Sequence, residues 1–197
     1  MNEFISAVET SLRRMNDPVI EQFLALWPVQ PWRWRETTAG GLPVLRWLGA
    51  AIANSASEFQ EIAKSLNTLR SNLAWSQTYS ATDAHTAFLD RYGWTELIGL
   101  RGPVASEALA AGFLLLGPAT EYPAHCHVAE EVYVPLSGVA QWRRGDGVWR
   151  KQRAGARIYH ASCESHAMRT ADEPLLALYL WRSGDLAQKS QFVGEHK

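Results

Sequence analysis

Cysteine is scarce in this sequence, with only Cys126 and Cys163 among 197 residues. Two cysteines are too few for a disulfide framework, and a reducing compartment would keep both as thiols. The first residues also lack the basic end and apolar stretch of a secretory signal, and no apolar run reaches membrane-spanning length. We therefore expect a cytoplasmic protein with no membrane partner.

An excess of charge of either sign is also missing. The chain has 19 Lys and Arg residues against 20 Asp and Glu residues, and no basic run could follow a phosphate backbone. We expect no nucleic-acid partner. The length suits one main functional unit with a single well-filled core.

The first half of the chain has apolar residues at helical spacing. They recur once per turn over residues 4–12, and Asp17 and Pro18 have the character of an N-cap and a first helical residue. We expect a pair of helices here. Ser55 and Glu58 have the spacing of a capping box, which predicts a further helix after residue 55.

From about Tyr92 the pattern changes to short apolar, β-branched and aromatic segments separated by turn signals. Many short strands at close spacing are typical of a sandwich or small barrel. The predicted strands are 113–117, 130–136, 139–144, 148–153, 157–160, 166–170 and 175–181, and the stretch 117–123 is predicted to be a turn. We expect a helical region at 1–92 that packs on a β-barrel domain at 93–197.

A short stretch, "HCHVAEEVYVPLSG", gathers two histidines and two glutamates. Alternate side chains of a strand share a face, so His125 and His127 point the same way, and Glu131 and Tyr133 can return to that face. Imidazole nitrogen and carboxylate oxygen are ligands for first-row divalent metals, and burying them together is costly without a cation. The stretch therefore predicts a metal site inside the barrel.

A third histidine should come from elsewhere in the β half. His166, at the start of a predicted strand, is the best candidate, and His160 is an alternative without a comparable pattern around it. Cys163 is open to two interpretations, a thiol near the metal or a buried inert cysteine, and the second is the simpler. Cys126 is expected only to pack.

These residues resemble the two sequence motifs of the cupin superfamily. The first motif, His-x-His followed at fixed spacing by Glu and then Gly, is matched by His125, His127, Glu131 and Gly138. The second is matched in spacing by Gly155 and His166, although Ala161 and Cys163 stand where Pro and Gly are usual. The resemblance implies a mainly β cupin barrel, a double-stranded β-helix or jelly roll, with an α-helical N-terminal region. It also implies one divalent transition metal ion, with iron, manganese, zinc, nickel and cobalt as the candidates.

The residues around both motifs, with a helical region before them, resemble the cupin-type dimethylsulfoniopropionate (DMSP) lyases. That resemblance implies a carbon–sulfur lyase that cleaves DMSP to dimethyl sulfide and acrylate. It implies metal positions and active-site tyrosines at His125, His127, Glu131, His166, Tyr122 and Tyr133. A homodimer is common for such barrels and is our first expectation.

The implied β-elimination requires a base near a cation. The proton to be removed lies alpha to a carboxylate and is weakly acidic, so a metal bound to that carboxylate would stabilise the developing negative charge. A nearby dication also favours phenolate over phenol, lowering a pKa that is normally about 10. We hypothesise that Tyr133 takes the proton, while Tyr122, on the loop before the histidines, positions the substrate or assists.

The substrate's dimethylsulfonium group is a methylated cation, for which aromatic faces are suitable partners. The aromatic residues expected to line the barrel are Trp142, Tyr159, Tyr179 and Trp181, and each has core packing as its simpler role. Trp149, in a loop, is a weaker candidate.

Two other functions are compatible with the same residues. An iron-dependent dioxygenase would use the same ligand set but would require oxygen, whereas the elimination would proceed without it. A non-catalytic cupin that binds a small molecule usually carries a DNA-binding module, and the first half of the chain has no basic recognition helix. The lyase is therefore the favoured prediction.

Overall fold

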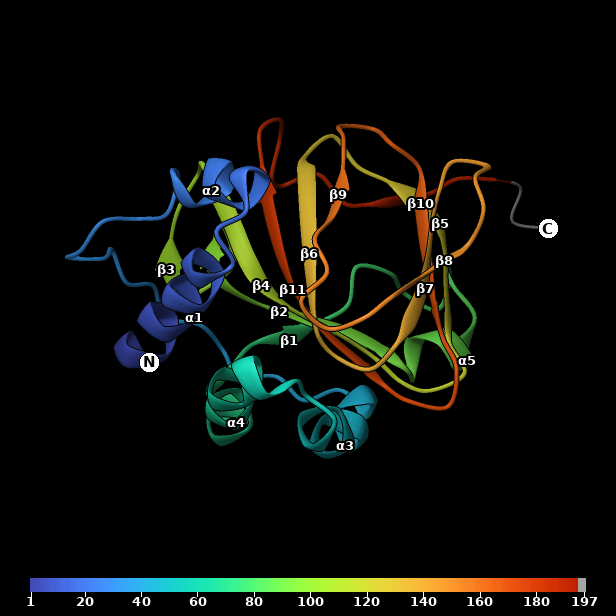
Figure 1. Cartoon of the computed structure of the whole chain (residues 1–197), viewed down its shortest axis with the longest axis horizontal. Helices are drawn as coiled ribbons and strands as arrows, with labels where there is room; N and C mark the ends of the chain where they lie inside the picture. The colour runs from blue at the N-terminus through green and yellow to red at the C-terminus, as the bar shows by residue number, and fades with distance from the viewer. Residues whose placement is uncertain (195–197) are drawn as a thin grey trace.

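Two β sheets form the body of the molecule in the computed structural model, which describes residues 1–194 (Figure 1). The strands of the larger sheet are β1 (Trp75–Ser76), β2 (Tyr92–Gly99), β3 (Val104–Ala105), β4 (Leu109–Leu116), β6 (Glu130–Ser137), β9 (Ile158–His160) and β11 (Leu175–Arg182). Those of the smaller sheet are β5 (Glu121–Cys126), β7 (Ala140–Arg144), β8 (Arg150–Gln152), β10 (His166–Thr170) and β12 (Gln191–Phe192). The spatial orders are β1-β2-β4-β11-β6-β9, with β3 beside β2, and β12-β5-β10-β7-β8. The strand pairs are antiparallel apart from β2–β3.

Helices from the first half of the chain cover the larger sheet (Figure 1). They are α1 (Asn2–Arg14), α2 (Pro18–Leu24), α3 (Leu48–Ala53) and α4 (Gln60–Leu69), with short 3-10 turns η1 (Pro43–Trp47), η2 (Ser57–Phe59) and η3 (Arg70–Asn72). The short helix α5 (Thr86–Leu89) lies apart from them, and its Phe88 belongs to the core between the two sheets (Figure 1). The expected mainly β fold with a helical N-terminal region is confirmed. The domain boundary at 92/93 stays a prediction, since the helices and the larger sheet share one apolar core.

The larger sheet lies between two apolar layers, and this position explains its sequence. One core joins its outer face to the helices, and a second core fills the space between the two sheets. Every residue of β4 is therefore buried, and so are six of the eight residues of β11. Strands buried on both faces appear as continuous apolar runs rather than as alternating ones.

The start of α2 matches the sequence-based expectation. Asp17 is the N-cap, and its Oδ1 accepts hydrogen bonds from the amides of Val19 (2.8 Å) and Ile20 (3.1 Å), while Pro18 is the first helical residue. Oδ2 accepts from Arg157 Nε at 2.9 Å. Asp17 thus caps the helix and ties it to the segment before β9.

The predicted capping box at Ser55 and Glu58 is wrong, although the helix exists. Ser55 Oγ donates to the carbonyl of Ile52 at 2.6 Å, and α4 begins at Gln60 without a side-chain cap. The amide after Ser55 donates to the carbonyl of Leu136 at 3.0 Å. This segment is held extended against β6, so Ser55 cannot cap α4.

The predicted turn at 117–123 is wrong at its second half, because β5 already begins at Glu121. Backbone bonding with β10 extends this strand, as in the 2.9 Å bond from the Thr170 amide to the Thr120 carbonyl. Pro123 is tolerated because the β5–β10 register shifts there, and prolines inside sheets occur at such irregularities.

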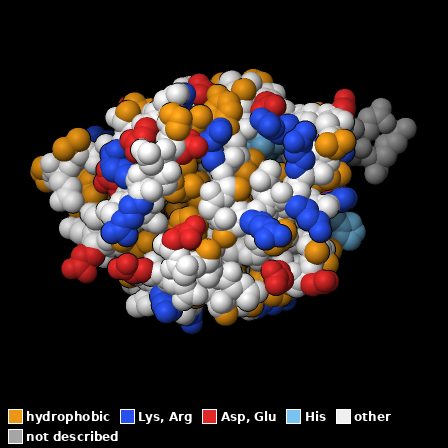
Figure 2. Space-filling model, viewed as in Figure 1, with side chains coloured by type: hydrophobic (Ala, Val, Ile, Leu, Met, Phe, Trp, Pro, Cys, Tyr) orange, Lys and Arg blue, Asp and Glu red, His pale blue; other side chains and the backbone are white. Residues whose placement is uncertain are grey.

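The surface has no dominant sign of charge on the face shown in Figure 2, where basic and acidic side chains are interspersed with apolar ones. Within residues 1–194, no helix combines the length and the apolar character that crossing a membrane requires.

Replacing Asp17 with alanine should lower the free energy of unfolding by about 1–2 kcal/mol, because the variant loses the cap and the ion pair with Arg157. Asp17→Asn retains a good cap and loses only the ion pair, so it should cost less than about 1 kcal/mol. Denaturant unfolding of both variants measures this difference. Equal losses would contradict the assigned capping role.

Candidate active site

Three predicted metal ligands converge in the interior between the sheets. His127 follows β5 directly, Glu131 lies on β6 and His166 begins β10, and their ligand atoms all lie within 4.8 Å of one another. Glu131 Oε2 is 3.2 Å from Nε2 of both imidazoles. All three side chains are buried, and Glu131 is 0% exposed. The cluster therefore combines one carboxylate with two imidazoles out of contact with solvent.

Backbone carbonyls fix which nitrogen of each imidazole carries the proton. His127 Nδ1 lies 2.9 Å from the carbonyl of Ala129, and His166 Nδ1 lies 2.8 Å from that of Glu164. A carbonyl only accepts, so Nδ1 is the donor and Nε2 of a neutral ring is a bare lone pair. Both lone pairs face the carboxylate of Glu131, and this arrangement is repulsive unless a proton or a cation lies between them.

A divalent transition metal ion fits this arrangement. Metal-bound histidines usually donate their other ring nitrogen to a carbonyl or carboxylate, as His127 and His166 do here. Burial alone would raise the pKa of Glu131, but His127 and His166, when they carry a proton on Nε2, hold it well below its usual value, and a cation at the same place would do so too. An ionised Glu131 can serve as a ligand, and the donor set suits zinc, iron, manganese, nickel or cobalt without selecting among them.

His125, the fourth predicted ligand, lies beside the cluster rather than within it. Its Nδ1 is 2.7 Å from the carbonyl of Pro123, and its ring centroid is 4.2 Å from that of His166. Burial, and then the neighbouring His166, hold the pKa of His125 well below its usual value. His125 is therefore neutral with an unprotonated Nε2, and its role as a ligand stays a prediction.

The remaining histidine and cysteine candidates lie outside the cluster. His160 is buried and stacks on His166 at 3.9 Å between ring centroids, and neither of its ring nitrogens has a hydrogen-bond partner in the described part of the chain. Cys163 is exposed rather than buried as expected, and it occupies a tight turn at a φ of 60°. Cys126 is partly buried.

Tyr122 reaches the interior through the irregularity in β5. His166 pairs with His125 and Met168 pairs with Tyr122, so three residues of β5 span the distance of two on β10. Strict alternation would place Tyr122 and His125 on opposite faces, but this bulge returns both to the interior, where their rings stack at 3.8 Å. Tyr122 therefore lies on a strand, not on the predicted loop.

Both candidate tyrosines are surrounded by groups that disfavour ionisation. Burial and the Glu131 carboxylate raise the pKa of Tyr133 well above its ordinary value. Burial and the neighbouring Tyr92 and Tyr79 do the same for the pKa of Tyr122, whose hydroxyl lies 3.1 Å from that of Tyr79 and 3.5 Å from that of Tyr92. Each phenol keeps its proton unless positive charge is added nearby.

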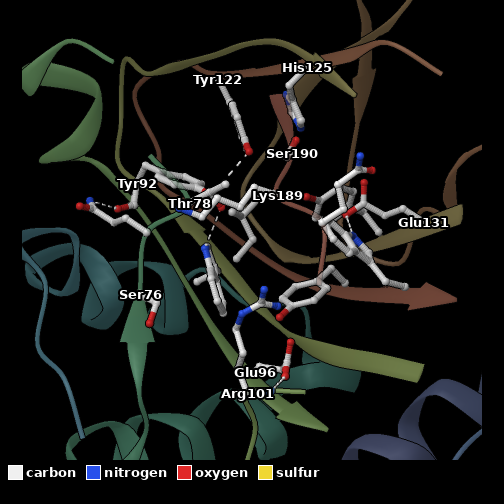
Figure 3. Close-up of a pocket in the computed structure, with 17 residues that line it drawn as sticks. Ser76, Thr78, Tyr92, Glu96, Arg101, Tyr122, His125, Glu131, Lys189 and Ser190 are labelled. Carbon is white, nitrogen blue, oxygen red and sulfur yellow. Dashed lines mark hydrogen bonds between the residues drawn. The ribbon is translucent and has the colours of Figure 1, made fainter. Parts of the chain in front are cut away.

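A cavity of about 230 Å³ opens onto this cluster (Figure 3). The predicted site residues that line it are Tyr122, His125, Glu131, Tyr133, Tyr179 and Trp181. Trp181 Nε1 donates to Glu131 Oε1 at 2.5 Å, and its ring stacks on His127 at 4.1 Å. The cavity is smaller than the roughly 300–1,000 Å³ of sites for drug-sized ligands, so it suits a small molecule.

Two of the predicted substrate-binding aromatics do not reach this cavity. Trp142 packs in the core with its ring 5.0 Å from that of Tyr133. Tyr159 points away, and its hydroxyl donates to Glu130 at 3.0 Å. Both residues therefore have structural contacts and do not line the cavity.

The opposite wall comes from segments that the sequence motifs do not cover. Tyr92, Trp94 and Glu96 alternate along β2, and all three line the cavity. Trp94 Nε1 donates to Thr78 Oγ1 at 3.1 Å, and Thr78 Oγ1 is 2.9 Å from the Tyr92 hydroxyl. Arg101 and residues 188–190 complete the wall. The position of these three residues at every second place along β2 is the sequence signal that could have identified this wall.

The amino-acid sequence is similar to that of known proteins. A family model for dimethylsulfoniopropionate lyase matches residues 19–177. The curated dimethylsulfoniopropionate lyase DddQ of Ruegeria pomeroyi is 40% identical over 112 residues, which are 57% of this chain and 55% of that protein. The putative dimethylsulfoniopropionate lyase DddL of Cereibacter sphaeroides is 30% identical over 146 residues, 73% of this chain and 60% of that protein. The chain spans less than two thirds of the length of either curated relative.

Solved structures agree over nearly the whole chain. A structure reported with the DMSP lyases RdDddP and RnDddQII superposes with a TM-score of 0.87 at 25% identity, covering 97% of this chain and 96% of that one. The structure of DddQ from Ruegeria pomeroyi gives 0.84 at 28% identity, covering 98% of both. A cupin-2 domain from Rhodospirillum rubrum gives 0.50 at 15% identity over 63% of this chain and 77% of that one, a likeness of fold alone. The expected cupin fold is thus confirmed, and the chain belongs to the DMSP lyase family.

Proposed function

We propose that this chain is a metal-dependent lyase that cleaves DMSP to dimethyl sulfide and acrylate by β-elimination. Family membership supports the substrate. The observation that carries the proposal is the buried cluster at the cavity wall, where Nε2 of two imidazoles lies 3.2 Å from one carboxylate beside Tyr133. A cation at this point explains why those groups are buried together.

A divalent ion held by His127, Glu131 and His166 would stabilise charge that develops on a substrate carboxylate and would favour phenolate at a nearby tyrosine. Trp181 orients the ligand carboxylate through its bond to Glu131 Oε1. Surrounding partners of this kind maintain the geometry of metal ligands.

Tyr133 is the proposed base. It lies two residues after Glu131 on the same face of β6, and it lines the cavity. Its phenolate takes the proton from the carbon alpha to the substrate carboxylate, and a carbon–carbon double bond forms. The carbon–sulfur bond breaks with its electron pair left on sulfur, which releases dimethyl sulfide and acrylate. Tyr122, held by Tyr79, positions the substrate or assists.

Aromatic side chains suit the cationic end of the substrate. Tyr92, Trp94, Tyr179 and Trp181 line the cavity, and aromatic faces attract methylated cations. The same rings exclude water from the reacting carbon. A cytoplasmic location and a homodimer complete the proposal, and both rest on the sequence-based expectation.

Tyr133→Phe should reduce dimethyl sulfide release from DMSP by at least about a hundredfold, because general bases contribute factors of this size. Tyr159→Phe is the matched control, since its hydroxyl bonds Glu130 away from the cavity. Headspace chromatography measures the product, and elemental analysis checks that the metal is retained. Unchanged turnover in metal-loaded Tyr133→Phe would refute the assigned base.

His127→Ala should lower the bound metal by more than about tenfold and abolish dimethyl sulfide release, because it removes one of the three converging ligand atoms. His85→Ala replaces an exposed histidine outside the site and should change neither quantity. Full metal content and activity in His127→Ala would exclude this metal site.

Dimethyl sulfide release should be equal under nitrogen and in air, since the elimination neither gains nor loses electrons overall. Headspace assays of the metal-loaded protein under both gases measure this. A strict oxygen requirement would favour the iron dioxygenase instead.

A further inference from the structure

The residues that line the cavity differ in exposure from one end to the other. Glu131, Tyr133 and His125 are buried, whereas Arg101 and Lys189 line the same cavity and are exposed. A side chain that contacts both cavity and solvent lies at the opening. Arg101 and Lys189, both labelled among the lining residues in Figure 3, come from distant parts of the sequence, and their exposure places them at the mouth of the cavity.

Arg101 is carried by a loop that is fixed from two sides. Arg35 Nη1 donates to the carbonyls of Leu100 (2.6 Å) and Gly102 (3.2 Å). From the cavity side, Glu96 Oε1 accepts the backbone amides of Arg101 (2.5 Å) and Gly102 (2.8 Å). The loop backbone is thus held before any ligand arrives, so little ordering cost remains for binding.

The segment after β11 brings Lys189 to the same opening. Arg101 Nη2 donates to the carbonyl of Ala187 at 3.0 Å, two residues before Lys189. Gln188 Oε1 accepts the amide of Val128 at 3.2 Å, which anchors the segment to the end of the smaller sheet. These hydrogen bonds hold the segment that carries Lys189 against the Arg101 side chain and the end of the smaller sheet.

Neither cation is neutralised by a carboxylate in direct contact. Within residues 1–194, no acidic side chain lies within 4.0 Å of the charged nitrogens of Arg101 or Lys189. The side-chain donors of Arg101 meet only backbone carbonyls, and the nearby Glu96 is occupied by backbone amides. Asp83 near Lys189 and Glu96 near Arg101 interact with these cations electrostatically without a contact ion pair, so the N–H donors that face the opening are available to a ligand.

We propose that Arg101 and Lys189 form an anion site at the cavity mouth, which captures the carboxylate of small carboxylic acids before they reach the inner cluster. Guanidinium groups bind carboxylates through paired N–H donors, and cations at an opening raise the rate of anion entry. The naming of DMSP and acrylate as its ligands rests on the proposed function. The site takes both, because each carries a carboxylate.

The test is acrylate binding to the whole 197-residue chain loaded with metal, measured by calorimetry. Arg101→Gln keeps an N–H donor for the Ala187 carbonyl but removes the charge, and should weaken acrylate binding by roughly tenfold, the loss of about one charge-assisted contact. Arg91→Gln is the matched control, since Arg91 also donates to a backbone carbonyl, that of Pro118, but does not line the cavity. Its acrylate affinity should match that of the wild type, and thermal unfolding verifies that both variants fold.

A kinetic measurement separates this role from a structural one. Arg101→Gln should raise KM for DMSP roughly tenfold with kcat nearly unchanged, and added salt should weaken wild-type binding more than binding by the variant. Unchanged acrylate affinity in Arg101→Gln, or equal losses in both variants, would overturn the anion site. Acrylate binding that depends on Arg101, in a protein that releases no dimethyl sulfide, would instead refute the lyase and leave this site standing.

Discussion

The site depends on one buried contact, the approach of Nε2 of two imidazoles to a single carboxylate, which needs a proton or a cation between the groups. Glu131 has one oxygen satisfied by the indole of Trp181, while its other oxygen lies 3.2 Å from Nε2 of both His127 and His166. Both rings are committed to this orientation by carbonyls on their Nδ1 side. A buried carboxylate faced by two unprotonated nitrogens is costly, and a shared cation would convert the same three groups into ligands. Tyr133 depends on that cation as well, because burial and Glu131 otherwise keep its pKa high.

The architecture makes this contact rigid. β11 lies at the centre of the larger sheet and β6 lies between β11 and β9, so that Glu131 is paired with Trp181 and Tyr133 with Tyr179. The helices bury the outer face of the sheet and so hold its inner face in place. The segment just before α5 also reaches the cavity through Thr78, so the first half of the chain contributes to the wall as well as to the support.

Local sequence rules predicted the residues that depend on alternation and spacing. His127, Glu131 and His166 converge as the strand period and the motif spacing required, and Asp17 caps its helix as expected. The period failed at Tyr122, where a bulge adds one residue to β5. A bulge arises from pairing with a distant strand, and the sequence of β5 alone does not specify it.

The cavity wall was harder to predict because it depends on long-range contacts. Trp142 and Tyr159 have the same aromatic character as Tyr179 and Trp181, yet only the latter two line the cavity. When both faces of a sheet are buried, the sequence pattern does not distinguish an aromatic residue that lines the cavity from one that packs in the core. Arg101 and Lys189 lie 88 positions apart and line one cavity only because the Arg101 side chain is hydrogen-bonded to the segment that carries Lys189, so no local signal links them.

The most direct measurement is a crystal structure of the protein loaded with zinc or cobalt, with anomalous scattering recorded at the metal absorption edge. The expected result is one anomalous peak about 2.0–2.2 Å from Nε2 of His127, Nε2 of His166 and a carboxylate oxygen of Glu131. A peak elsewhere, or no peak while Glu131 accepts hydrogen bonds from two protonated imidazoles, would contradict a cation as the group that these residues are arranged to hold.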